Sequence, residues 1–186
     1  MKRIVLVFGL ISGAILSVTM IMSAVYADQS GVHGYIIGYT SMVVAFLLVY
    51  FGIRSYRDNV AGGALSFGRG FAVGICITIL ACLCYVASWE FVYHKFFPDF
   101  MDKYASYAIE KTRTSGATPA QIDAKVLEMT RAKEMYKNPF FRMAETFIEA
   151  FPVGLLFTLV SAGLLRRKRS GMGGAAPIVG TSPVAR

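Results

Sequence analysis

The chain has 186 residues, of which 55% are hydrophobic and only 16% are charged, with a net charge of +8. Soluble domains carry roughly 25% charged residues, so this composition excludes an ordinary soluble globular protein and indicates a membrane protein. The surplus positive charge lies beside apolar segments, so we expect the lipid bilayer as its surroundings and no nucleic acid as a partner.

The first predicted membrane helix covers residues 4–26, which carry no charge and follow Lys2 and Arg3. At about 1.5 Å per residue this segment crosses a hydrocarbon core of about 30 Å. A cleaved signal peptide is the alternative, because Val25 and Ala27 fit the small-residue rule before a cleavage site. The apolar region of a signal peptide has only about 7 to 15 residues, which favours an uncleaved anchor.

The second predicted membrane helix covers residues 35–53 and stops at Arg54. The next residues are rich in glycine, a composition typical of a turn that returns the chain to the same side of the membrane. The glycines are Gly62, Gly63, Gly68 and Gly70. No strand precedes them and no Gly-Lys-Ser/Thr follows, so we interpret them as a flexible loop rather than a phosphate-binding loop.

Two more membrane helices are predicted at residues 71–93 and 140–165. The first of these ends in an aromatic cluster around Trp89 and Tyr93, and such rings favour the headgroup level of a bilayer. The second contains Pro152, which removes a backbone donor and predicts a bend. It ends at a basic run that begins with Arg166.

Residues 94–139 form the main polar segment, and we predict two amphipathic helices there. The first covers about residues 99–114 and ends at Gly116, and the second begins with Thr118, Pro119 and Gln121, which together predict a capping box. The expected apolar faces are Phe100, Tyr104, Tyr107 and Ala108 on the first helix and Ile122, Val126, Met129 and Tyr136 on the second. We expect the pair to pack on itself or lie on the membrane surface rather than bind a ligand.

The orientation follows from the placement of Lys and Arg in the short connections. Basic residues lie before the first predicted helix, in the second connection and directly after the last helix, whereas the first loop has none. We therefore expect both termini in the cytoplasm. The predicted organisation is a membrane domain at residues 1–169 and a disordered cytoplasmic tail at residues 170–186.

Four ionisable residues lie inside predicted membrane helices, where charge is costly. These are Glu90, Arg142, Glu145 and Glu149. One hypothesis is that the three carboxylates converge into a site for a proton or cation, with Arg142 as the counter-charge. The alternative, which we favour, is that Arg142, neighbouring aromatic side chains and backbone groups satisfy them without any function. Arg142 precedes Glu145 by three residues, a spacing that would allow an ion pair between them.

No catalytic motif is present, and we expect neither catalytic residues nor a cofactor nor a metal site. Cys82 and Cys84 point in different directions on a helix and are interpreted as small apolar packing residues. Two Gly-x-x-x-Gly motifs, Gly9 with Gly13 and Gly70 with Gly74, predict close helix contacts either within the chain or between copies.

Several sequence strings resemble one known family. They are FGLISG from Phe8, FGIRSYRDN from Phe51, SFGRGFAVG from Ser66, SWE ending at Glu90, PDFMDKYA from Pro98, MYKNPFFR from Met135 and FPVGLL from Phe151. Together they resemble a bacterial membrane family catalogued only as a domain of unknown function, number four-one-nine-nine in that series. The resemblance implies four membrane helices with an extended outer segment before the last one, and it implies no activity.

We therefore expect an all-α integral membrane protein with four transmembrane helices and an extramembrane two-helix segment between the third and fourth. The resemblance places the protein in the cytoplasmic (inner) membrane of a bacterial cell. The expected function is that of a non-enzymatic association or accessory protein of the cell envelope, acting as a homo-oligomer or within an envelope complex. The alternative is an oligomeric ion or proton-coupled carrier or channel that uses Glu90, Glu145 and Glu149.

Overall fold

The computed structural model describes residues 1–26 and 31–167, and this part of the chain forms six helices without a strand. The helices are α1 (Lys2–Tyr26), α2 (Gly31–Asn59), α3 (Phe67–Phe96), α4 (Phe100–Thr114), α5 (Pro119–Tyr136) and α6 (Pro139–Leu165). Four of them, α1, α2, α3 and α6, are long and apolar enough to cross a membrane. The predicted fold class is therefore confirmed. The tail predicted from residue 170 lies outside the described residues.

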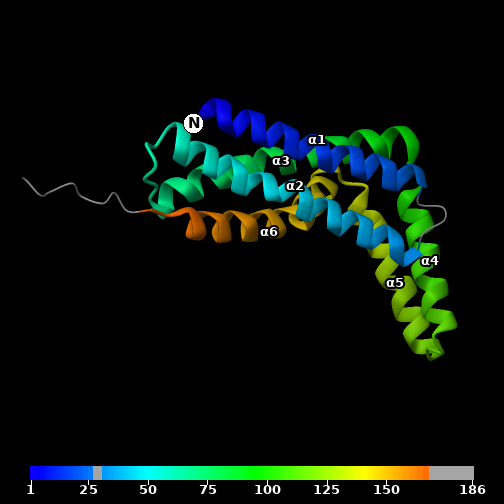
Figure 1. Cartoon of the computed structure of the whole chain (residues 1–186). Coiled ribbons are helices and arrows are strands. Elements are labelled where there is room, and N and C mark those ends of the chain that lie inside the picture. Colours follow the sequence, from blue (N-terminus) through cyan, green and yellow to red (C-terminus); the bar gives the residue numbers. More distant parts are fainter. Residues whose placement is uncertain (27–30, 168–186) are drawn as a thin grey trace, which may run out of the picture.

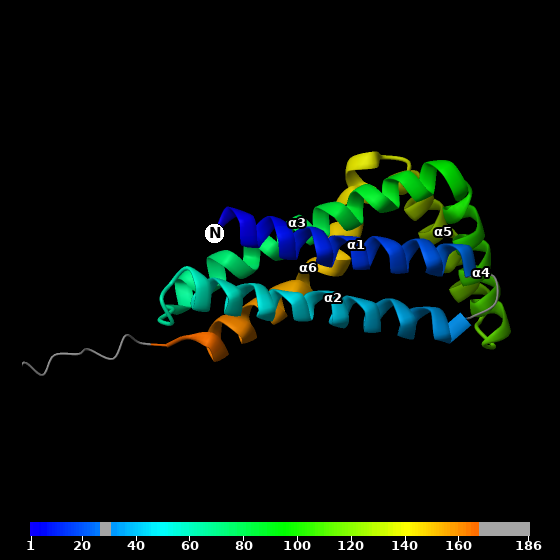
Figure 2. The ribbon, with the colours of Figure 1, turned by 45° about the horizontal axis from the view of Figure 1, so that its top comes forward.

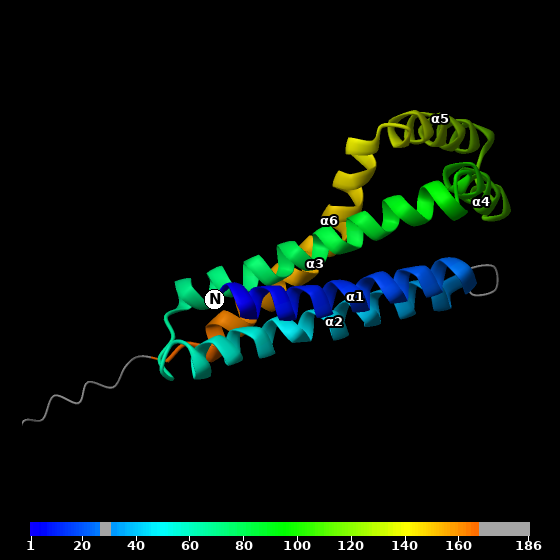
Figure 3. The ribbon, with the colours of Figure 1, turned by 90° about the horizontal axis from the view of Figure 1, so that it is seen from above.

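The four membrane helices form a bundle, and α4 and α5 form a hairpin at one end of it (Figures 1 and 3). Helix α3 contacts α1, α2 and α6, and α2 also contacts α1 and α6. The first residues of the chain, the α2–α3 loop and the end of α6 lie at the opposite end from the hairpin (Figure 2). We call these the terminal end and the hairpin end.

The membrane helices continue further than their charge-free segments predicted. Helix α2 ends at Asn59 instead of residue 53, because Arg54 pairs with Asp58 at 3.7 Å, four residues along the helix. Arg57 also pairs with the adjacent Asp58, at 2.7 Å. Helix α3 begins at Phe67, four residues before the predicted start, because the Ser66 side chain accepts a hydrogen bond from the Arg69 amide at 3.5 Å. Local pairing and capping thus carry both helices past the apolar segment.

Both Gly-x-x-x-Gly motifs are used inside the chain. A Cβ atom on Gly13 would lie 2.6 Å from Cys84 Cβ, and one on Gly74 would lie 2.8 Å from a methyl group of Thr158. The first motif therefore packs α1 against α3, and the second packs α3 against α6.

The glycine-rich loop differs from the predicted flexible turn. Gly62 and Gly63 have φ angles of 63° and 81°, which suit glycine, whereas Gly68 and Gly70 belong to helix α3. Leu65 is almost fully buried and exchanges two backbone hydrogen bonds with Arg167, at 3.0 and 2.9 Å. The loop is therefore fixed to the end of α6, a long-range contact that glycine content cannot indicate.

The hairpin has the predicted helices but not all of the predicted contacts. Thr118 and Gln121 form the capping box, and Gly116 adopts a positive φ of 78° in the turn. Helix α4 contacts α5 and buries Ala105, whereas Tyr107 is 61% exposed, so that part of the predicted apolar face was wrong. Val126 is likewise exposed, because α5 turns Met129 and Tyr136 inward instead.

Helix α6 is continuous from Pro139 to Leu165 and contains Pro152 near its middle. Figure 3 shows that its axis changes direction along its length. Because proline removes one helical hydrogen bond and crowds the preceding turn, it is the physical cause of this change. The bend carries the first half of α6 toward the hairpin.

Candidate functional site

Arg142 and Glu90 form a bidentate ion pair between α6 and α3 at the hairpin end. Arg142 Nε and one terminal nitrogen donate to the two Glu90 carboxylate oxygens at 2.7 and 2.6 Å. The side chains are only 3% and 14% exposed. Charge-assisted pairs of this geometry are among the strongest polar contacts in proteins, and burial makes each partner depend on the other.

Local sequence places Arg142 in the first turn of α6. The Asn138 side chain accepts a hydrogen bond from the Phe140 amide at 2.9 Å, and Pro139 occupies the first helical position. Both are standard features of a helix start. Arg142 thereby enters the bundle where α5 ends, close to the last turns of α3.

The remaining surface of the Arg142 guanidinium is also occupied. It donates to the Tyr136 carbonyl oxygen at 3.1 Å and lies 4.1 Å from the centre of the Tyr93 ring. His94 Nε2 lies 3.3 Å from the same guanidinium, although the His94 side chain is 67% exposed. A buried cation needs such a complete set of partners, including the face of an aromatic ring.

Aromatic side chains surround this pair and connect it to the hairpin. Trp89 donates its indole N–H to the Tyr136 hydroxyl at 2.8 Å and packs edge-on against Phe100 of α4 at 5.0 Å between ring centres. Burial raises the pKa of the Tyr136 phenol, so its hydroxyl stays neutral and can accept this hydrogen bond. We call Arg142, Glu90, Tyr93, Tyr136 and Trp89 the Arg142 junction. It joins helices α3, α5 and α6, with Phe100 adding α4.

Glu149 and Glu145 lie apart from the junction, farther along α6. Glu149 accepts a hydrogen bond from the Tyr85 hydroxyl of α3 at 3.4 Å. Glu145 forms no ion pair with any described residue, and both glutamates are exposed in the single chain. At about 1.5 Å per residue, Glu149 lies about 15 Å from the start of α6, well inside a membrane span.

The structure therefore divides the four predicted site residues into two pairs. It brings Glu90 to Arg142, and it leaves Glu145 and Glu149 farther along α6, where Glu149 accepts a hydrogen bond from Tyr85 of α3. The ion pair that sequence spacing suggested, Arg142 with Glu145, is not formed, because Arg142 turns inward to α3 instead. Among the described residues, no three His, Cys, Asp or Glu side chains gather in a way that could hold a metal ion.

Sequence reasoning missed the roles of Tyr136, Tyr85 and His94. Tyr136 was predicted only as an apolar position of α5, but its hydroxyl and carbonyl oxygens both contact the junction. Tyr85 has no local signal, since its partner lies 64 residues away in the sequence. Polar atoms on otherwise apolar side chains acquire such partners only when the helices meet.

Comparison with known proteins gives one family match. A family model described as "Protein of unknown function (DUF4199)" matches residues 7–167. The matched region contains all of the hairpin and nearly all of the four membrane helices. No curated protein and no solved structure matches the chain.

Proposed function

The chain belongs to this family of proteins of unknown function, and we propose that it is a non-enzymatic association protein of the bacterial cytoplasmic membrane. It binds a second, different membrane protein through the exposed face of α6. The observation that carries the proposal is the pair Glu145 and Glu149, which lie inside a membrane span on a face that the described chain leaves exposed.

Contact with lipid is energetically unfavourable for this face of α6. An ionised side chain near the centre of a membrane span costs about 3 kcal/mol on insertion scales, so carboxylates there normally face protein or water. Glu145, Ile148 and Glu149 share one side of α6 because they are three and four residues apart. Ile148 is 66% exposed, so an apolar contact surface adjoins the two acids. A partner helix with Lys, Arg or hydroxyl groups at this depth would pair with the two acids, and its apolar side chains would cover Ile148.

A different protein fits this face better than a second copy of the chain. A two-fold symmetric contact through α6 would place Glu149 of one copy against the same acidic face of the other. Such like charges repel each other strongly in a membrane. The small-residue motifs, which commonly mediate contacts between copies, already pack α1, α3 and α6 together.

The association is tested by placing a photo-crosslinking amino acid at Ile148 in cells. We expect one discrete adduct with another membrane protein, and we expect it to disappear when Glu145 and Glu149 are both replaced by leucine. The matched control replaces Glu128 and Glu134, two exposed acids of the hairpin, by leucine and keeps the adduct. Adducts only with lipid, or only with a second copy of the chain, would contradict the proposal.

A carrier or channel is the alternative, and the contact between Glu149 and Tyr85 supports it. Arg142 already neutralises Glu90, so only Glu145 and Glu149 remain to exchange a proton or cation. The test is ion flux into vesicles that contain the purified protein. Flux that Glu149→Gln abolishes without unfolding the protein would favour the carrier, and flux equal to that of empty vesicles would exclude it.

The proposed orientation places both ends of the described chain in the cytoplasm and the hairpin outside. Basic residues at the terminal end support it, since Lys and Arg accumulate on the cytoplasmic side of membrane proteins. In a variant without native cysteines, we expect an impermeant thiol reagent to label Ala120→Cys in intact cells and Asp58→Cys only after the membrane is opened. Labelling of Asp58→Cys in intact cells would reverse the orientation.

A further inference from the structure

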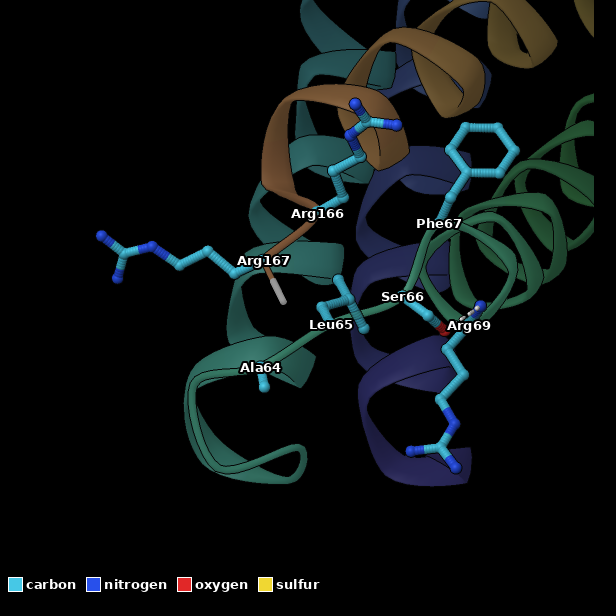
Figure 4. Close-up of a pocket in the computed structure, with 7 residues that line it drawn as sticks. All are labelled: Ala64, Leu65, Ser66, Phe67, Arg69, Arg166 and Arg167. Carbon is cyan, nitrogen blue, oxygen red and sulfur yellow. Dashed lines mark hydrogen bonds between the residues drawn. The ribbon is translucent and has the colours of Figure 1, made fainter. Parts of the chain in front are cut away.

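A basic hollow lies at the terminal end of the bundle, opposite the Arg142 junction. Its volume is about 780 Å³, within the range of small-molecule sites. It is lined by the α2–α3 loop, the first turn of α3 and the residues after α6 (Figure 4). The two backbone hydrogen bonds between Leu65 and Arg167 hold these segments together, so the hollow is a fixed part of the fold.

Three arginines, Arg69, Arg166 and Arg167, surround this hollow. Within the described part of the chain, none of them pairs with a carboxylate, in contrast to Arg54 and Arg57, which both pair with Asp58. Figure 4 shows their guanidinium groups pointing away from one another, that of Arg167 to the left and that of Arg69 downward. Like charges separate in this way, and an anion between them would remove the repulsion.

The hollow also lies where two candidate membrane spans end, so a bilayer crossed by these helices would place its headgroups there. It adjoins the first turn of α3 and the last turn of α6, where the membrane spans end. Phe67 lines it, and Leu164, in the preceding turn of α6, is 72% exposed. Apolar side chains that face acyl chains beside arginines that face phosphate groups match the two parts of a phospholipid. Basic pockets between membrane helices bind anionic headgroups by this arrangement.

We propose that Arg69, Arg166 and Arg167 form a site for the phosphate group of an anionic phospholipid. Arginine suits this ligand because its planar guanidinium donates two parallel hydrogen bonds to phosphate oxygens. Arg69 offers this contact from α3, and Arg166 and Arg167 offer it from the end of α6. The site therefore links the two helices through a lipid, at the end of the bundle that lacks the junction.

The test is lipid binding to the purified full chain, measured by native mass spectrometry with phosphatidylglycerol, cardiolipin and phosphatidylcholine. We expect the two anionic lipids to bind more tightly than phosphatidylcholine. Replacing all three arginines by glutamine should weaken the binding of anionic lipid by about tenfold or more. Each basic residue near an anionic surface raises the affinity by about fivefold. The matched control replaces Lys111, Arg113 and Arg131 of the hairpin by glutamine and leaves binding unchanged.

Two further measurements distinguish a lipid phosphate from a soluble anion and test the contribution of charge. Inorganic phosphate at millimolar concentration should neither compete with the lipid nor raise the melting temperature of the protein. Replacing the three arginines by lysine keeps the charge and should keep a preference for anionic over neutral lipid. Competition by inorganic phosphate would assign the site to a soluble anion. Equal binding by the wild-type protein and the glutamine variant would overturn it entirely.

Discussion

Replacing Arg142 with methionine destabilises the protein by about 3 to 5 kcal/mol, the cost of leaving one member of a buried ion pair without its partner. Methionine fills much of the space of the arginine side chain, so the loss comes mainly from the Glu90 carboxylate and not from a cavity. Glu90 is 14% exposed and receives two hydrogen bonds from Arg142. The carboxylate is then left in a poorly solvated place without its counter-charge.

A double-variant cycle separates the pair from its surroundings. Replacing both Arg142 with methionine and Glu90 with leucine removes both charges, and we expect the double variant to be more stable than Arg142→Met alone. Unfolding in mixed micelles can be followed through Trp89, the only tryptophan of the chain and a member of the junction. Circular dichroism then shows whether the helices unfold in the same transition.

The control for this prediction is Lys103→Met. Lys103 pairs with Asp99 at 3.1 Å, but both side chains are at least half exposed, so the pair contributes little. We expect the control to unfold almost like the wild-type protein. A loss of stability in Lys103→Met as large as that in Arg142→Met, or a double variant whose loss equals the sum of the single losses, would show that the Glu90–Arg142 pair has no special weight.

Replacing Gly154 with alanine destabilises the bundle by about 1 to 3 kcal/mol, and valine there costs more, because the core has no space for a side chain. A Cβ atom at this position would collide with a methyl group of Thr78 and lie 2.7 Å from the Phe46 ring. The Gly154 carbonyl oxygen also accepts a hydrogen bond from Thr78 at 3.3 Å. The substitution therefore pushes α6 away from α2 and α3 together.

Gly163 provides the control on the same helix, since nothing lies within 4 Å of a Cβ atom built there. Gly163→Ala should be neutral or slightly stabilising, because alanine favours a helix by up to about 1 kcal/mol over glycine. Combining Gly154→Ala with Thr78→Ser removes the nearest methyl group and should restore part of the loss. Equal stability of the two alanine variants in micelle unfolding would contradict the predicted contact.

The membrane helices could be predicted because hydrophobic length and local caps are properties of neighbouring residues. The capping box at Thr118 and the turn at Gly116 appear as predicted, since both depend on residues only a few positions apart. The predicted end of α2 and the predicted start of α3 both left out residues that belong to the helix. Charge-free length measures the apolar segment, whereas hydrogen bonding continues the helix into its charged ends.

The candidate site was predictable in its residues but not in its pairings. Glu90, Arg142, Glu145 and Glu149 are conspicuous in sequence because ionisable groups are costly in a membrane. Spacing along α6 suggested Arg142 with Glu145, since it describes only neighbours on one helix. The structure instead gives Arg142 to Glu90, 52 residues away. That choice depends on how α3 and α6 cross, which a single segment does not contain.

Sequence alone thus determined that this chain is an all-α membrane protein with four spans and a hairpin, because solvent preference and helix capping act locally. The tertiary structure decided which glutamate is neutralised and which two remain exposed on α6. It also joined the glycine-rich loop to the residue after α6, and so placed three arginines around one hollow. These features arise from contacts between segments that are distant in sequence, and only the packing of the helices brings such segments together.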